Sequence, residues 1–293
     1  MIALNTNLLT FSAPSWGEAD YFSHFYAATY AFDSETRKRL SGAKGHFNKA
    51  VIITRLLGKL APGMQHDVDE LNERGFTEAA NSNEFSAVAE SVFAELYSSI
   101  DCARKVVTTV FRGCRRMPDS TRKLFQAIAQ GVIGEDMPEP VRAAFRNATW
   151  YPRLRMIRDE LTHADVGTCR LSSDGTGKIV YTHFSMRVGG QPLQVSDLMG
   201  EIAQLTDDVN RFMGELFRAL NELLRPTHAD VLCGFFNGGR AYMRRIANER
   251  PITFDSGSCL SREWFDSDST ARCPFAANCG AYARSPAGPA AKV

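Results

Sequence analysis

The sequence predicts a mainly α-helical fold into which one small antiparallel sheet is inserted. Apolar residues recur at steps of three and four over most of the first 163 positions and again over residues 197–223, whereas strand-like alternation is confined to residues 168–195. With 293 residues, 44% of them hydrophobic, and a net charge of +1, the chain does not have the composition of a disordered or collagen-like protein. It also has no run of about 18 nearly uncharged apolar residues, so we predict no membrane-spanning helix.

The first 82 residues are predicted to form an N-terminal helical region. Aromatic residues recur at helical spacing from Tyr21 to Tyr30, and a second apolar series from Val51 to Leu60 ends at the helix-breaking pair Pro62-Gly63. The polar segment that follows, up to residue 83, predicts a domain boundary.

Four helices are predicted for the central part of the chain. Their apolar stripes cover residues 83–112, 120–131, 141–163 and 197–223. Pro152 interrupts the third stripe, so we expect this helix to kink or restart there, and Pro226 stops the fourth.

Between the third and fourth helices the pattern changes to short alternating runs. Residues 169–172, 178–188 and 191–195 are predicted to be strands of an antiparallel meander, with a turn at Gly189-Gly190 and an edge strand marked by Pro192. The predicted domain therefore covers residues 83–225 and carries a strand insertion at 168–195.

Residues 226–293 are predicted to form an irregular C-terminal extension. Several glycines interrupt its apolar stretch, residues 241–250 are interpreted as a basic helix, and the Pro-, Ala- and Gly-rich residues 285–293 as a disordered tail.

The candidate catalytic residues lie at the end of the third helix, in the segment Arg158-Asp159-Glu160-Leu161-Thr162-His163. It resembles the Arg-x(4 to 6)-His signature of the HEPN superfamily, and the order of helices over residues 83–225 is similar to that of HEPN domains. The resemblance implies a four-helix bundle core with the meander inserted between its third and fourth helices. It also implies a homodimer that cleaves RNA without a metal ion, with Arg158 and His163 as catalytic residues and Asp159 in support. We expect a toxin or antiphage defence effector, with an antitoxin or regulatory protein as a further partner.

The residue types suit cleavage by a 2′-hydroxyl. A histidine titrates near neutral pH and can move a proton, and an arginine offers a planar fork of donors to a phosphorane-like transition state. On an ideal helix, residues five apart are separated by about 140° around the axis and about 7.5 Å along it. Arg158 and His163 therefore converge only if the helix ends near His163 or if a second copy contributes to the site.

A structural interpretation of the same residues is an alternative. Arg158 can form an ion pair with a neighbouring carboxylate such as Glu160 or with one from another helix, and His163 can be favoured by the dipole at the helix C-terminus. The corresponding alternative function is a non-catalytic HEPN-like module that binds RNA, a nucleotide or a protein partner.

Charge is distributed unevenly along the chain. Residues 104–158 contain twelve basic and four acidic residues, a net charge of +8, which leaves −7 for the rest. A basic surface beside the motif is what a phosphate backbone requires, and Trp150 and Tyr151 offer rings for base stacking. The predicted RNA-binding residues are Arg104, Lys105, Arg112, Arg115, Arg116, Arg153 and Arg155.

The seven cysteines favour a reducing compartment, because an odd number cannot all pair within one chain. Since the first 16 residues also lack a basic signal-peptide region, we expect a cytoplasmic protein. The zinc candidates are Cys259, Cys273 and Cys279, with Cys233 or His228 as a fourth ligand. No Cys-x-x-Cys pair is present and the spacings match no known metal motif, so we predict unliganded thiols, no metal and no cofactor.

Overall fold

The structure, a computed structural model, describes residues 14–163, 165–235, 241–250, 252–253, 256–268 and 273–286. It divides the chain into two compact units. We call Asp33–Leu216 the helical unit, and Met1–Phe32 together with Phe217–Val293 the terminal unit.

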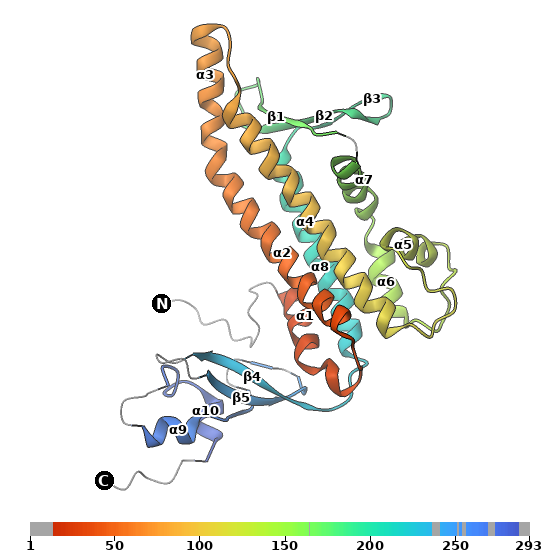
Figure 1. The fold of residues 1–293 in the computed structure, drawn as a ribbon, viewed down its shortest axis with the longest axis vertical. Helices are drawn as coiled ribbons and strands as arrows, with labels where there is room; N and C mark the ends of the chain where they lie inside the picture. Colours follow the sequence, from red (N-terminus) through yellow and green to blue (C-terminus); the bar gives the residue numbers. More distant parts are fainter. Residues whose placement is uncertain are drawn as a thin grey trace. The chain divides into compact units, whose positions relative to one another are not determined.

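The helical unit is built on two long helices, α2 (Ser34–Leu60) and α4 (Ala80–Val110), which lie side by side (Figure 1). Asp33 caps α2 by accepting a hydrogen bond from the Thr36 backbone N–H at 2.7 Å. A 3-10 turn and the short helix α3 (Met64–Arg74) connect the two helices, and Gly75 ends α3 in the left-handed conformation. The boundary predicted at residue 82 falls inside this unit, because α2 buries its apolar face in the same core as α4.

The remaining helices of the helical unit follow the predicted order. They are α5 (Thr121–Ala129), α6 (Glu139–Asn147), α7 (Tyr151–His163) and α8 (Leu198–Asn221), the last of which ends in the terminal unit. The predicted break is a restart: α6 ends before Pro152, which occupies the first turn of α7, where a missing N–H removes no helical hydrogen bond. Phe212 of α8 lies against the rings of Phe125, Phe145 and Trp150, so an aromatic cluster joins α5, α6 and α8.

The meander is present as predicted. Strands β1 (Thr168–Leu171), β2 (Ile179–Val188) and β3 (Gln191–Val195) form an antiparallel sheet in the order β1-β2-β3. Gly189 and Gly190 both have positive φ in the turn between β2 and β3, and Pro192 lies on the edge strand β3. The insertion between the third and fourth predicted helices is therefore confirmed.

The terminal unit corrects the prediction of an irregular C-terminal extension. It contains α1 (Pro14–Phe25), a second antiparallel sheet of β4 (His228–Phe235), β5 (Ala241–Ala247) and β6 (Ser258–Cys259), and the short helices α9 (Arg262–Ser267) and α10 (Gly280–Arg284). The expected basic helix at 241–250 is wrong. Arg245 faces Asp230 across the β4–β5 pair and donates two hydrogen bonds to its carboxylate, at 2.7 and 2.9 Å, so the basic residues serve cross-strand pairing.

The described residues thus form a mainly helical protein with two small antiparallel sheets, which confirms the predicted mainly α class. Within this part of the chain, no helix is both long enough and apolar enough to cross a membrane. Of the tail predicted to be disordered, residues 287–293 lie outside the described residues.

Candidate functional site

The predicted motif lies on the last turns of α7, and its arginine is held in place from two sides. Arg158 Nη1 donates a hydrogen bond to Asp159 Oδ1 at 2.9 Å, and its guanidinium carbon lies 4.4 Å from the centre of the Tyr97 ring on α4. A cation placed over an aromatic face is attracted by the ring quadrupole. The carboxylate and the ring together fix the guanidinium, whose side chain is still about one third exposed (32%).

Asp159 lies between two arginines of α7. Besides the bond from Arg158, its Oδ2 lies 3.8 Å from Arg155 Nε. Asp159 is therefore a positioning group for Arg158, and it also neutralises part of the positive charge along the helix. The structural interpretation expected Glu160 or a carboxylate of another helix as the partner of Arg158, and the structure pairs it with Asp159 instead.

His163 is the last residue of α7, and its side chain lies outside the described part of the structure. The helix runs without interruption from Arg158 to His163, so the two residues keep the helical separation of about 140°. Continuous helix over these five positions therefore does not bring them to one face of α7.

The segment that follows α7 is fastened to β2 by a polar cluster. His183 is buried, and because the Met186 N–H donates to its Nδ1 at 3.2 Å, the ring hydrogen is on Nε2, which donates to the Asp165 carbonyl oxygen at 3.0 Å. Ser185 Oγ donates toward Glu160 Oε1 at 3.1 Å and Asp165 Oδ2 at 3.2 Å. With both ring nitrogens engaged, His183 has a structural role, and the cluster orients the end of α7.

A cavity of about 330 Å³ opens beside the motif helix. Its lining combines aromatic and aliphatic groups with three arginines: Arg122, Phe125, Gln126, Ala129, Phe145, Arg146, Ala148, Thr149, Tyr151, Pro152 and Arg155. Phe125 and Tyr151 stack face to face at the cavity wall, with ring centres 3.7 Å apart. An apolar floor with a cationic rim suits a planar ring that carries a phosphate.

The cavity and the motif are joined by shared residues. Arg155 lines the cavity and approaches Asp159, which holds Arg158. On the aromatic side, Tyr151 lines the cavity, and its hydroxyl lies 3.5 Å from that of Tyr97, the ring beneath Arg158. Burial raises the pKa of Tyr151, so this hydroxyl stays protonated at neutral pH.

One donor of Arg155 has no hydrogen-bond acceptor among the described residues. Its Nε is buried and makes no hydrogen bond to any described residue, since the nearest carboxylate oxygen, on Asp159, is 3.8 Å away. A buried donor without an acceptor costs free energy.

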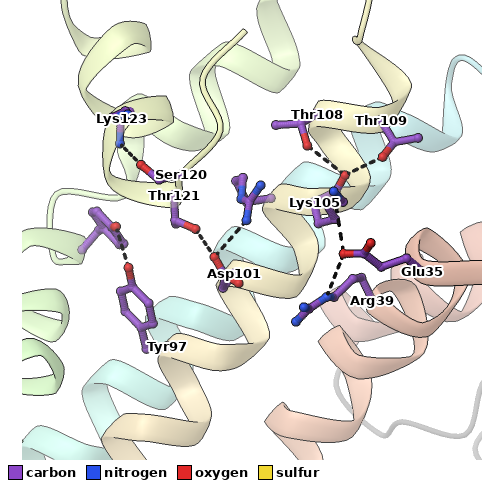
Figure 2. A network of polar contacts seen from close by, with 12 residues as sticks. Glu35, Arg39, Tyr97, Asp101, Lys105, Thr108, Thr109, Ser120, Thr121 and Lys123 are labelled. Carbon is purple, nitrogen blue, oxygen red and sulfur yellow. Dashed lines mark hydrogen bonds and ion pairs between the residues drawn. The ribbon is translucent and has the colours of Figure 1, made fainter. Parts of the chain in front are cut away.

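The predicted RNA-binding residues divide into two groups. Arg104 and Lys105 pair with Asp101 and Glu35, at 3.2 and 3.8 Å, in the network of Figure 2, where Asp101 also accepts a hydrogen bond from Thr121 at 2.5 Å. Arg153 pairs with Glu201 of α8. Lys105 and Arg153 thus join neighbouring helices, whereas Arg104 pairs with a carboxylate of its own helix α4, and all three are ordinary structural uses of charge.

The other predicted RNA-binding residues are placed differently. Arg112, Arg115 and Arg116 are exposed beyond the C-terminal end of α4, with no ion pair to the described residues. Arg155 alone among the seven lines the cavity. The sequence did not single out Arg122, Arg146 or Phe125 as candidate site residues. The two arginines differed in no way from the other basic residues of positions 104–158, and Phe125 was one of several apolar residues in the stripe of residues 120–131.

The zinc candidates lie in the terminal unit. Cys259 is on β6, Cys279 precedes α10, and Cys273 lies in the turn before it, with Cys233 of β4 on the same cavity. His228 begins β4 and is not among the residues that line this cavity.

Comparison with known proteins identifies no relative. No family model, curated protein or solved structure matches the chain. The function is therefore argued from the site itself.

Proposed function

We propose that the protein is a metal-independent endoribonuclease of the HEPN type. The observation that carries the proposal is the arrangement of Arg158. This residue lies near the C-terminal end of α7, five positions before His163, and is held by Asp159 and Tyr97. Beside it lies a cavity that is lined by aromatic rings and arginines. The order of a long α4, short α5 and α6, the motif helix α7, an inserted sheet and a long α8 supports the HEPN-like bundle.

In the proposed reaction, the 2′-oxygen of a ribose attacks the adjacent phosphorus. His163 takes the proton of the 2′-hydroxyl, and a protonated imidazole returns one to the 5′-oxygen as the P–O5′ bond breaks. Arg158 binds the phosphoryl oxygens, whose negative charge grows in the transition state, and Asp159 keeps the guanidinium in position. The products are a 2′,3′-cyclic phosphate and a 5′-hydroxyl.

The cavity supplies substrate binding in this scheme. A base adjoining the scissile phosphate stacks against Phe125 and Tyr151, and Arg155 and Arg122 contact the neighbouring phosphates. Because Arg158 and His163 lie on different sides of one helix, we propose that α7 of a second copy completes the site in a homodimer. Cytoplasmic action as a toxin or defence effector, restrained by an antitoxin or regulatory protein, belongs to the same proposal.

The test compares purified wild type with Arg158→Ala and His163→Ala on a panel of labelled RNAs in the presence of EDTA. Each substitution is expected to lower the cleavage rate by about 10²–10⁴-fold, the usual contribution of a catalytic acid–base or oxyanion-stabilising group. Arg55→Ala and His66→Ala, which alter exposed residues outside the site and outside the predicted RNA-binding set, are the matched controls and should cleave like wild type. The assignment fails if wild type leaves every RNA intact, or if both site variants cleave as fast as it does.

A second candidate function is a non-catalytic module that binds RNA, a nucleotide or a protein partner. The ion pair between Arg158 and Asp159 favours it, because a guanidinium already paired with a carboxylate is less available to a transition state. This candidate predicts that a labelled oligonucleotide binds and is not cut, and that Arg155→Ala weakens binding. Cleavage that is lost in His163→Ala excludes it.

A further inference from the structure

Four cysteines of the terminal unit surround a single cavity of about 170 Å³. They come from four separate places in the chain, and aromatic and basic side chains line the same cavity. The full lining is Leu232, Cys233, Tyr242, Arg244, Cys259, Cys273, Phe275, Cys279, Ala281 and Tyr282. Each thiol lies within electrostatic range of the other three, and none forms a disulfide.

The backbone directs these cysteines to the cavity by recognisable local features. The register of β4 against β5 shifts between Leu232 and Gly234, so Cys233 is the extra residue of a β-bulge. Bulges turn a side chain out of the regular alternation of a strand. Cys259 lies on β6, which pairs with the other edge of β5, and Cys279 is the N-cap residue of α10.

Backbone N–H groups point at two of the sulfurs. The backbone groups of Ser261 and Arg262 act to lower the pKa of the Cys259 thiol, and those of Phe275 and Ala276 act to lower the pKa of the Cys273 thiol, while burial raises both. In both cases the donors are two and three residues after the cysteine. A neutral thiol is a weak acceptor, whereas a metal-bound thiolate carries negative charge that paired N–H groups stabilise.

The part of the terminal unit after residue 227 contributes few buried apolar side chains to hold these segments together. Among its described residues after 227, the buried apolar side chains are those of Val231, Ile246, Phe265 and Ala281. Small folds with so little buried apolar surface commonly depend on a disulfide or a structural metal. The four thiols are in the right place for such a cross-link.

We propose that Cys233, Cys259, Cys273 and Cys279 bind one structural zinc ion. Zinc prefers four thiolates in a tetrahedron with Zn–S distances of about 2.3 Å. No three His, Cys, Asp or Glu side chains of the described residues are already spaced to hold a metal, so the thiols turn toward the centre of the cavity as the ion enters. Binding releases four thiol protons to solvent and leaves a complex of charge −2.

Arg244 provides charge compensation for that complex. It is 6% exposed, lines the same cavity, and lies within electrostatic range of Cys233. Its position in β5 opposite Cys259 places a positive charge beside the sulfurs. A cation at this position lowers the electrostatic free energy of an anionic metal complex beside it.

The experiment measures metal in the full-length protein after expression with zinc. We expect about one zinc per chain, and after cobalt substitution the thiolate-to-metal charge-transfer and intense visible bands of a four-sulfur tetrahedral site. Cys233→Ser and Cys273→Ser should each weaken metal binding by at least tenfold. Cys114→Ser, at a buried thiol of the helical unit, is the matched control and should retain the metal.

A second measurement does not depend on how the variants fold. Wild-type protein is titrated with a mercurial reagent while released zinc is followed with a chromophoric chelator, and we expect release only as the four thiols react. A folded wild type that contains no zinc and gives no cobalt spectrum overturns the proposal. Disulfides among these cysteines, or undiminished zinc in both serine variants, overturn it equally.

Discussion

Replacing Glu90 tests how the protein fastens the segment after the motif helix to α4. One oxygen of Glu90, Oε1, accepts hydrogen bonds from the Gly167 N–H at 2.6 Å and from the Tyr181 hydroxyl at 3.0 Å. Both donors are buried, and the contact is so close that a Cβ on Gly167 would lie 2.3 Å from the Tyr181 ring. Neither donor can turn to solvent when the acceptor is removed.

The magnitude follows from counting the donors left without a partner. Each buried donor that loses its acceptor costs about 1–3 kcal/mol, so the loss of both acceptor contacts in Glu90→Ala should lower the free energy of unfolding by about 2–6 kcal/mol. Glu90→Gln keeps an acceptor oxygen in place and should change it by less than about 1 kcal/mol at neutral pH. Glu84→Ala, an exposed position on the same helix, is the control and should stay within about 0.5 kcal/mol of wild type.

The charge of Glu90 adds a dependence on pH with a definite sign. Burial raises its pKa above the ordinary value and outweighs the lowering effects of Gly167, Tyr181 and His183. A carboxyl whose pKa is raised by folding contributes stability that is fully present below the unfolded pKa of about 4.3 and is lost as the pH rises through the folded pKa. The stability of wild type relative to Glu90→Gln should therefore fall as the pH rises from about 4 to 7.

Urea denaturation followed by circular dichroism at several pH values measures both effects. Equal losses of stability in Glu90→Ala and Glu90→Gln would show that the two hydrogen bonds are not the source of the stabilisation. A wild-type advantage over Glu90→Gln that grows with pH would show that burial does not control the carboxyl.

Two further predictions concern carboxylates that hold backbone or side-chain donors. Asp67 accepts hydrogen bonds at the start of α4 from the Asn81 side chain and the Ser82 N–H, each at 2.7 Å. Asp67→Ala should therefore lower the free energy of unfolding, measured by thermal or urea denaturation, by about 2–3 kcal/mol. The exposed Asp69 on the same helix is the control, and Asp69→Ala should change this free energy little. Asp159→Asn should tighten RNA binding, because it removes a negative charge from beside the arginines of α7. The same substitution should slow cleavage by about tenfold or more, because Arg158 loses the carboxylate that fixes its position. Anisotropy and cleavage measured on one RNA separate these two effects, and unchanged values of both would refute the positioning role.

Much of the helical unit could be predicted because its signals are local. The apolar stripe of α4, the proline that restarts α7 and the Gly189-Gly190 turn each determine a short stretch of backbone without help from distant residues. The packing of α2 on α4 could not be predicted in this way. An amphipathic helix shows which of its faces is buried, and the sequence does not show what covers that face.

The second sheet was missed because its strands lack the usual pattern. Strand β5 alternates little and carries Arg244 and Arg245, so a helix fitted its composition equally well. What makes it a strand is pairing with β4, including the ion pair to Asp230, and β6 consists of two residues that no pattern would reveal. Strands of this kind are determined by cross-strand contacts, which exist only once the chain is folded.

The candidate sites show the same division between local and long-range information. The segment from Arg158 to His163 is continuous, and its position at the end of a helix was predictable. The neighbouring cavity draws Arg122, Phe125 and Phe145 from two other helices, and nothing in the sequence brings these three residues together.

The cysteines illustrate why spacing alone is a poor guide to the zinc site that we propose. The four thiols are separated by 25, 13 and 5 residues, and these intervals match no compact zinc motif. The intervals follow instead from the topology of the sheet, since β4 and β6 both pair with β5 and the turn before α10 lies on the same cavity. The bulge at Cys233 then completes the group, because it turns to the cavity a thiol that regular alternation would direct elsewhere. The spacing of cysteines along the sequence predicts a metal site only when one loop carries two of the ligands. Here each of the four thiols of the proposed site belongs to its own segment of the chain.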